Sequence, residues 1–207
     1  MSVTERLYPG INLGATAPET HATAEEKVFG FWVFLMSDLI IFALLFATYA
    51  TMNPATAGGP AAKDIFEIKS AAIETGVLLA SSFTFGMASL AMKYNRSRSL
   101  LIFWLAVTLL LGASFLGFEV HDFLNFVSKG APPTRSGFLS ALFVLVATHG
   151  LHVTGGCFWI VVMMVQVLVF GIDRDVKVRL LRLGLFWHFL DIIWVGIFSI
   201  VFLQGLA

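Results

Sequence analysis

Residues 137–170, GFLSALFVLVATHGLHVTGGCFWIVVMMVQVLVF, form the longest apolar stretch of the chain and decide its fold class. A helix that crosses a hydrocarbon core needs about 20 apolar residues. This stretch exceeds that length, so we expect a transmembrane helix that is tilted or projects beyond the membrane surface. His149 and His152 lie three residues apart within it, on one helical face. The two imidazoles could hold a metal or a haem, or could be hydrogen-bonded groups in a packed bundle.

The composition is that of an integral membrane protein. Of the 207 residues, 58% are hydrophobic and only 13% are charged, and the mean hydropathy of +0.87 lies far outside the range of an ordinary globular domain. Lys plus Arg equals Asp plus Glu at 13 each, so the charge balance gives no indication of a nucleic acid or an acidic substrate. The single cysteine, Cys157, excludes an intramolecular disulfide and a c-type haem attachment, and we expect it to be a small core residue.

Five apolar segments are long enough to span a membrane, which predicts an all-α protein with a transmembrane domain over residues 28–207. Residues 1–27 are polar and lack a secretion signal, so we expect a mobile cytoplasmic tail. Thr23 and Glu26 have the spacing of a capping box, which predicts the start of the first helix there. The predicted spans are Val28 to Thr51, Ala71 to Met92, Leu100 to Val120, Gly137 to Phe170 and Leu181 to Leu203.

The distribution of cations predicts the orientation. The connections around residues 93–98 and 174–182 carry seven Lys or Arg residues, and the other two connections, which are longer, carry four. The positive-inside rule therefore places the N-terminal tail in the cytoplasm, and with five spans the C-terminus lies on the periplasmic side.

Small and polar residues recur at helical spacing in the first, second and fifth spans, which indicates helix–helix interfaces. The small-residue faces of the first two spans exceed what five helices need among themselves. We therefore expect one of them to contact a partner, and Gly86→Leu to weaken assembly. We also expect lipids in a cleft between the first two and the last three spans.

The ionisable residues of the spans fall into two groups by depth, counted at about 1.5 Å per residue from the cytoplasmic end of each span. An inner group lies at about 10–15 Å and an outer group at about 27–31 Å. Because a lone charge near the bilayer centre costs about 2.5–3.5 kcal/mol, these groups should pair or share protons. The expected pairs are Asp38 with His188 or Asp191, and Glu119 or Glu74 with His149 or His152.

A metal or haem site competes with this structural interpretation. A bis-histidine haem needs two imidazoles facing each other at one level, and His188 lies about 17 Å nearer the cytoplasm than His149 or His152 by the same count. His149 and His152 with Glu119 could offer three ligands to copper or zinc. Each imidazole also has a carboxylate at a similar depth, so hydrogen bonding suffices to explain it. We predict structural pairs, with a metal site or a proton path as the alternatives.

Five segments together resemble subunit III of haem-copper terminal oxidases: FGFWVFLMSDLIIFALLFATYA (29–50), AGGPAAKDIFE (57–67), ETGVLLASS (74–82), RSGFLSALFVLVATHGLHVTGG (135–156) and LFWHFLDIIWVGIFSIVFL (185–203). HGLHV and WHFLD are the most specific motifs. The five-span form is most similar to subunit III of cytochrome o (bo-type) ubiquinol oxidases. The resemblance begins near residue 27.

The resemblance implies a non-catalytic subunit that binds no haem and no copper. In that family the haems and copper lie in subunit I, and subunit III supports the stability of subunit I and access to it by protons and oxygen. The resemblance further implies subunits II and IV as partners, a V-shaped cleft that holds phospholipid, a proton-translocating complex, and a bacterial inner membrane. Asp38 occupies the position of a buried acid that is often a glutamate in the family.

Several alternatives remain open. The chain could belong to an aa-type quinol oxidase, a cytochrome c oxidase or a nitric oxide reductase, because the electron-donor site lies in other subunits. A small proton-coupled carrier would explain the intramembrane acids, but such proteins have inverted repeats or broken helices. A haem-bearing quinol-reducing anchor would reveal itself by its absorbance.

Overall fold

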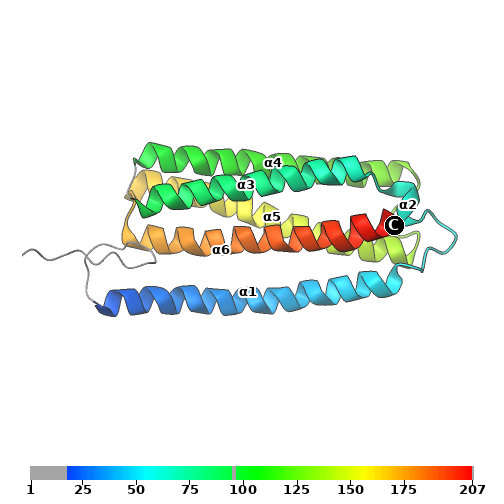
Figure 1. The fold of residues 1–207 in the computed structure, drawn as a ribbon, viewed down its shortest axis with the longest axis horizontal. Helices are drawn as coiled ribbons and strands as arrows, with labels where there is room; N and C mark the ends of the chain where they lie inside the picture. Colours follow the sequence, from blue (N-terminus) through cyan, green and yellow to red (C-terminus); the bar gives the residue numbers. More distant parts are fainter. Residues whose placement is uncertain (1–17, 95–96, 207) are drawn as a thin grey trace, which may run out of the picture.

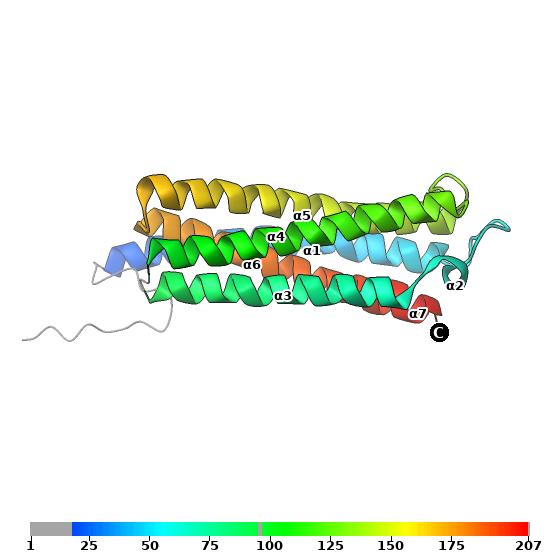
Figure 2. The same cartoon turned by 90° about the horizontal axis from the view of Figure 1, so that it is seen from above.

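The computed structural model describes residues 18–94 and 97–206, and this part of the chain is helical (Figure 1). Five long helices run side by side along the long axis in both views (Figures 1 and 2). A short helix lies in the connection between the first two, and the last long helix continues through a π-helical segment. The elements are α1 (Pro18–Met52), α2 (Ala62–Ile65), α3 (Ile68–Lys93), α4 (Arg98–Ser128), α5 (Gly137–Phe170), α6 (Arg174–Ile197), η1 (Phe198–Leu203) and α7 (Gln204–Leu206).

Within the described residues, five segments are long and apolar enough to cross a membrane, which confirms the predicted number and order of spans. The first lies within α1, and the last combines α6 with η1. The chain is therefore a multi-pass membrane protein. The segments are Ala24–Met52, Ile68–Lys93, Arg98–Ser128, Gly137–Phe170 and Arg174–Leu203.

The helix ends differ from the predicted ones except in α5. α1 begins at Pro18 rather than Val28, so Thr23 lies inside the helix and not at its start. α4 continues past Val120 to Ser128, and α6 begins at Arg174 rather than Leu181. Hydropathy detects only the part of a helix that lies in lipid, whereas the backbone hydrogen bonds of a helix continue into water. The tail predicted for residues 1–17 lies outside the described residues.

Local signals fix both ends of α5. Ser136 is the N-cap, and its Oγ accepts a hydrogen bond from the Leu139 N–H at 3.2 Å. At the other end Gly171, with a φ of 79°, donates its N–H to the Val167 carbonyl at 3.1 Å. This positive φ is a conformation that side-chain-bearing residues rarely adopt, so the position favours glycine.

α1 stands at one side of the bundle, separate from α3 and α4 (Figure 1). It packs against α5 and α6, whereas α3 packs against α4 and α6, and α5 packs against α4 and α6. The first two membrane-spanning helices, α1 and α3, therefore do not form a pair. This corrects the expected grouping of the first two spans against the last three.

Glycines let large aromatic side chains pack close to the backbones of neighbouring helices. Cβ atoms at Gly112 and Gly156 would lie 2.8 and 2.9 Å from the Trp187 ring, and one at Gly184 would lie 2.9 Å from Phe85. The Trp187 indole N–H donates to Ser81 Oγ at 3.1 Å. Inside lipid the hydrophobic effect does not drive helices together, so close packing of this kind stabilises their association. A Cβ at Gly86, in contrast, has no neighbour within 4 Å among the described residues.

Candidate functional site

Asp38 of α1 pairs with His152 of α5. The carboxylate is buried, with 7% of the residue exposed, and its Oδ2 lies 3.4 Å from His152 Nε2. The other ring nitrogen, Nδ1, lies 2.7 Å from the Thr148 carbonyl oxygen. A carbonyl only accepts, so Nδ1 carries a hydrogen and Nε2 faces the acid. One further proton, on either Nε2 or the carboxyl group, makes the pair electrically neutral.

The depth count predicted that Asp38 pairs with His188 or Asp191. That prediction is wrong, because Asp38 contacts His152 instead. α1 begins at Pro18 rather than Val28, and α6 begins at Arg174 rather than Leu181, so both depth counts change by a similar amount. Depth therefore does not distinguish the possible partners of Asp38. The orientation of its helical face does: the side chain meets His152 of α5 and not α6.

His188 belongs to a separate group formed by α3 and α6. Its Nδ1 lies 2.7 Å from Ser82 Oγ and 3.6 Å from Asp191 Oδ2, one helical turn further along α6. Asp191 is buried, whereas the His188 side chain is 46% exposed. The predicted residues His188 and Asp191 therefore lie together, but apart from Asp38.

His149 differs from the other two span imidazoles because neither of its ring nitrogens has a hydrogen-bond partner among the described residues. It is fully buried between aromatic rings, with centroid separations of 6.4 Å to Phe42, 5.8 Å to Phe115 and 5.3 Å to Trp194. The expected hydrogen bond to Glu74 or Glu119 is therefore not formed. Aromatic packing, which the depth count did not consider, holds this ring.

Glu74 of α3 and Glu119 of α4 meet at a cavity of about 10 Å³ that Asp122 also lines. Both glutamates are nearly inaccessible, at 2% and 5% exposed. Gly150 of α5 makes room for the second one, because a Cβ there would lie 2.5 Å from both Glu119 carboxylate oxygens.

Sequence reasoning missed Asp122, whose carboxylate accepts a hydrogen bond from Ser70 Oγ at 3.0 Å. Asp122 follows Glu119 by three residues and so shares its helical face. This spacing was visible in the sequence, but the predicted span ended at Val120 and excluded the acid. We call Glu74, Glu119 and Asp122 the carboxyl cluster.

The described part of the chain contains no group of three or more His, Cys, Asp or Glu side chains arranged to hold a metal ion. The imidazoles are separated by their partners: His152 faces α1, His149 is enclosed by aromatic rings, and His188 binds Ser82.

These observations define a five-helix membrane protein whose buried acids and imidazoles form small separate groups. The sequence matches the cytochrome c oxidase subunit III family over residues 8–206. Cytochrome bo(3) ubiquinol oxidase subunit 3 of Pseudomonas aeruginosa is 45% identical over 201 residues, which cover 97% of this chain and 96% of that protein. The same subunit of Pseudomonas putida is 48% identical over 185 residues, 89% of each chain.

Cytochrome c oxidase subunit 3 of Bacillus sp. (strain PS3) is 40% identical over 193 residues, which cover 92% of this chain and 93% of that protein. The chain belongs to the cytochrome c oxidase subunit III family. The resemblance inferred from the HGLHV and WHFLD motifs is thereby confirmed, and it begins earlier than expected, at residue 8.

Proposed function

We propose that the chain is the non-catalytic subunit III of a proton-pumping ubiquinol oxidase of the cytochrome bo(3) type. The observation that carries this proposal is the near full-length match to the relative from P. aeruginosa, which is named as a subunit of a ubiquinol oxidase. The relative from P. putida carries the same name. The haems and the copper then belong to subunit I, with subunits II and IV as further partners in the bacterial inner membrane.

The polar groups pair with one another between helices, which favours a structural rather than a catalytic role for this chain. Asp38 and His152 connect α1 to α5, and Ser82 and His188 connect α3 to α6. These contacts lie between helices that are distant in sequence, so they stabilise the bundle that packs against subunit I. In this role the chain supports the stability of subunit I and access to it by protons and oxygen.

The ends of the bundle support a cytoplasmic N-terminus and a periplasmic C-terminus. The start of α1 lies at the same end as the α3–α4 and α5–α6 connections, and the C-terminus lies at the other (Figure 1). The first end carries Lys93, Arg98, Arg174, Lys177, Arg179 and Arg182. The other end carries fewer cations in longer connections, so the positive-inside rule favours this orientation.

A groove between α1 and α5 favours the proposal that this chain binds phospholipid. It has a volume of about 340 Å³ and lies near the C-terminal end of α1. Its walls are almost entirely apolar, and they fit an acyl chain better than a headgroup. The lining residues are Leu45, Thr48, Met52, Gly137, Ser140, Ala141 and Val144.

A second candidate is an oxidase that uses cytochrome c, favoured by the relative from Bacillus sp. (strain PS3). One purification distinguishes the two. The tagged chain is isolated from its native membranes in mild detergent, and oxygen consumption is measured with ubiquinol and with reduced cytochrome c. We expect co-purified haem and activity with ubiquinol. Activity with cytochrome c alone would favour the second candidate, and the absence of any haem protein would contradict both.

A further inference from the structure

The carboxyl cluster lies where five helical elements meet: α3, α4, α5, α6 and η1. Glu74 comes from α3, Glu119 and Asp122 come from α4, Leu142 and Val146 from α5 close the cavity, and the Trp194 and Phe202 rings complete its wall. One oxygen of Glu74 and one of Glu119, Oε1 in each case, have no hydrogen-bond partner among the described residues. A buried polar atom of this kind carries a large desolvation cost unless something binds it.

The cavity has the dimensions of a water site. Its volume of about 10 Å³ is close to the minimum that accepts one water molecule, which also needs two to four polar partners. The carboxyl cluster supplies those partners. Apolar and aromatic side chains form the rest of the wall, so the lining offers no competing hydrogen-bond group there beyond the indole of Trp194, which donates to Thr75 Oγ1 at 3.0 Å.

Charge balance then requires protons. The residues that line the cavity in the described part of the chain include three carboxyl groups and no lysine or arginine. α5 adds only His149, whose ring is packed against Trp194 and has no bonded partner in the described residues. Adjacent carboxylates repel each other, and an uncompensated charge within a membrane is costly.

We propose that Glu74 and Glu119 enclose one water molecule and hold at least one proton between them. The protonated carboxyl group donates to the water, and the water donates to the other carboxylate, which satisfies both free oxygens. The cluster is thus a proton-holding site on the side of the bundle that carries the C-terminus. The proposal does not depend on the assignment to a quinol oxidase, because it rests only on groups within this chain.

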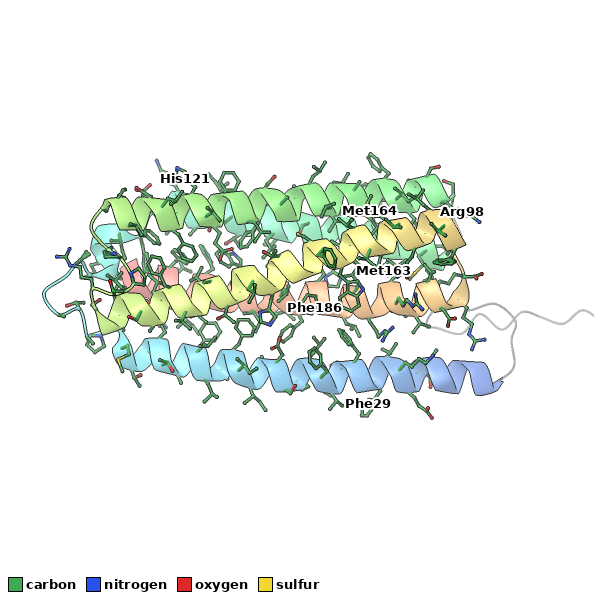
Figure 3. All side chains as sticks on the ribbon, turned by 180° about the vertical axis from the view of Figure 1, so that it is seen from behind. Phe29, Arg98, His121, Met163, Met164 and Phe186 are labelled. Atoms are coloured by element: carbon green, nitrogen blue, oxygen red, sulfur yellow. The ribbon has the colours of Figure 1, made fainter. Side chains whose placement is uncertain are left out.

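Asp122 connects this site to the surface. It is partly exposed, with 17% of its side chain accessible, and its Oδ1 lies 3.5 Å from Nδ1 of His121, which is 77% exposed. Figure 3 shows His121 near the end of α4, pointing away from the bundle. A proton can therefore pass from solvent to His121, to Asp122 and through the enclosed water to a glutamate, and can return by the same route.

Infrared spectroscopy of the full chain in liposomes tests the site. The native chain, Glu74→Gln, Glu119→Gln, the double variant and Asp191→Asn are compared at neutral pH. We expect a stretching band of a protonated carboxyl group that disappears in the double variant and persists in Asp191→Asn. An unchanged band in a folded double variant would overturn the proposal.

Carbon-13 labelling of the glutamate carboxyl groups in the native chain provides a test without substitutions, in case a variant does not fold. The expected result is an isotope shift of the band, because the other buried acids of the spans, Asp38 and Asp191, are aspartates. A band that does not shift would contradict the assignment. Loss of the band on addition of sodium at constant pH would also contradict it, since the cluster would then bind a cation in place of a proton.

The route is tested by the rate at which the band shifts after transfer to D₂O. Asp122→Asn should slow that shift, and His121→Gln should slow it less because water reaches Asp122 directly. Equal rates in the native chain and in Asp122→Asn would overturn the route through Asp122.

Discussion

Single residues show most clearly what packing adds to sequence. The HGLHV motif places His149 and His152 on one helical face, and the structure gives them different surroundings: His152 meets a carboxylate, and His149 meets three aromatic rings. The need for partners was predictable from the cost of polar groups in lipid. The identity of the partners was not, because depth alone does not say which face a neighbouring helix presents.

The pair of Asp38 and His152 should stabilise the fold by coupling α1 to α5. Asp38→Ala leaves the imidazole without its carboxylate, and we expect a loss of about 1–3 kcal/mol in the free energy of unfolding. A double-mutant cycle with His152→Ala, measured by denaturation in mixed micelles, isolates the interaction. Ser37→Ala is a suitable control, because the Ser37 hydroxyl donates only to the Phe34 carbonyl of its own helix. Strictly additive effects of the two substitutions would contradict the coupling.

A surface pair should give a small acid sensitivity. A hydrogen bond from Lys129 to Glu67, together with the positive charge of Lys129, lowers the pKa of Glu67 below its usual value of 4.5. Because the folded-state pKa is the lower one, this pair contributes stability above pH 4.5 and loses it as the pH falls through the lowered pKa. As the pH is lowered, the melting temperature of Glu67→Gln should therefore fall less than that of the native chain. Identical pH profiles for the native chain and the variant would disprove the contribution.

At the scale of helices, the sequence predicted the number and order of the spans because each requires a long apolar run. α1, α4 and α6 were predicted too short: α1 and α6 begin earlier than predicted, and α4 ends later. Polar residues such as His121 and Asp122 can continue a helix beyond the lipid. That error had a consequence for the candidate site: the predicted third span ended at Val120, which removed Asp122 from consideration. α5 was predicted correctly because Ser136 and Gly171 mark its ends.

Two adjacent glycines of α5 offer a matched test of helix packing. A Cβ at Gly156 would lie 2.9 Å from the Trp187 ring, whereas a Cβ at Gly155 has no neighbour within 4 Å among the described residues. Gly156→Ala should therefore destabilise the chain by about 1–3 kcal/mol through overpacking, and Gly155→Ala should not. The free energy of unfolding in mixed micelles is the relevant measurement. Equal effects of the two substitutions would show that the contact of α5 with α6 is looser than described.

At the scale of the whole molecule, the exposed apolar helix faces indicate that lipid and partner subunits complete the structure. Phe29 on α1 points away from the bundle (Figure 3), and its exposed fraction is 65%. Family membership was predictable from motifs spread over the chain. The faces that contact partner subunits were not predictable, because lipid-facing and partner-facing helices are equally apolar.

Gly86 tests one of these faces. Since a Cβ there has no neighbour within 4 Å in the described residues, Gly86→Leu should leave the stability of the chain itself unchanged. If a partner helix packs on this part of α3, the yield of assembled complex should fall, because the larger side chain prevents close approach. Complex yield and chain stability are measured in parallel. An unchanged yield would place the partner on another face.

We propose that this chain holds no redox centre of its own, and that its buried acids and imidazoles serve packing, pairing between helices and proton binding. The most direct measurement is the visible absorption spectrum and metal content of the purified chain, compared with those of the complex that it forms. We expect haem absorption and copper in the complex and neither in the chain alone. A Soret band, or iron or copper in stoichiometric amount in the isolated chain, would contradict it.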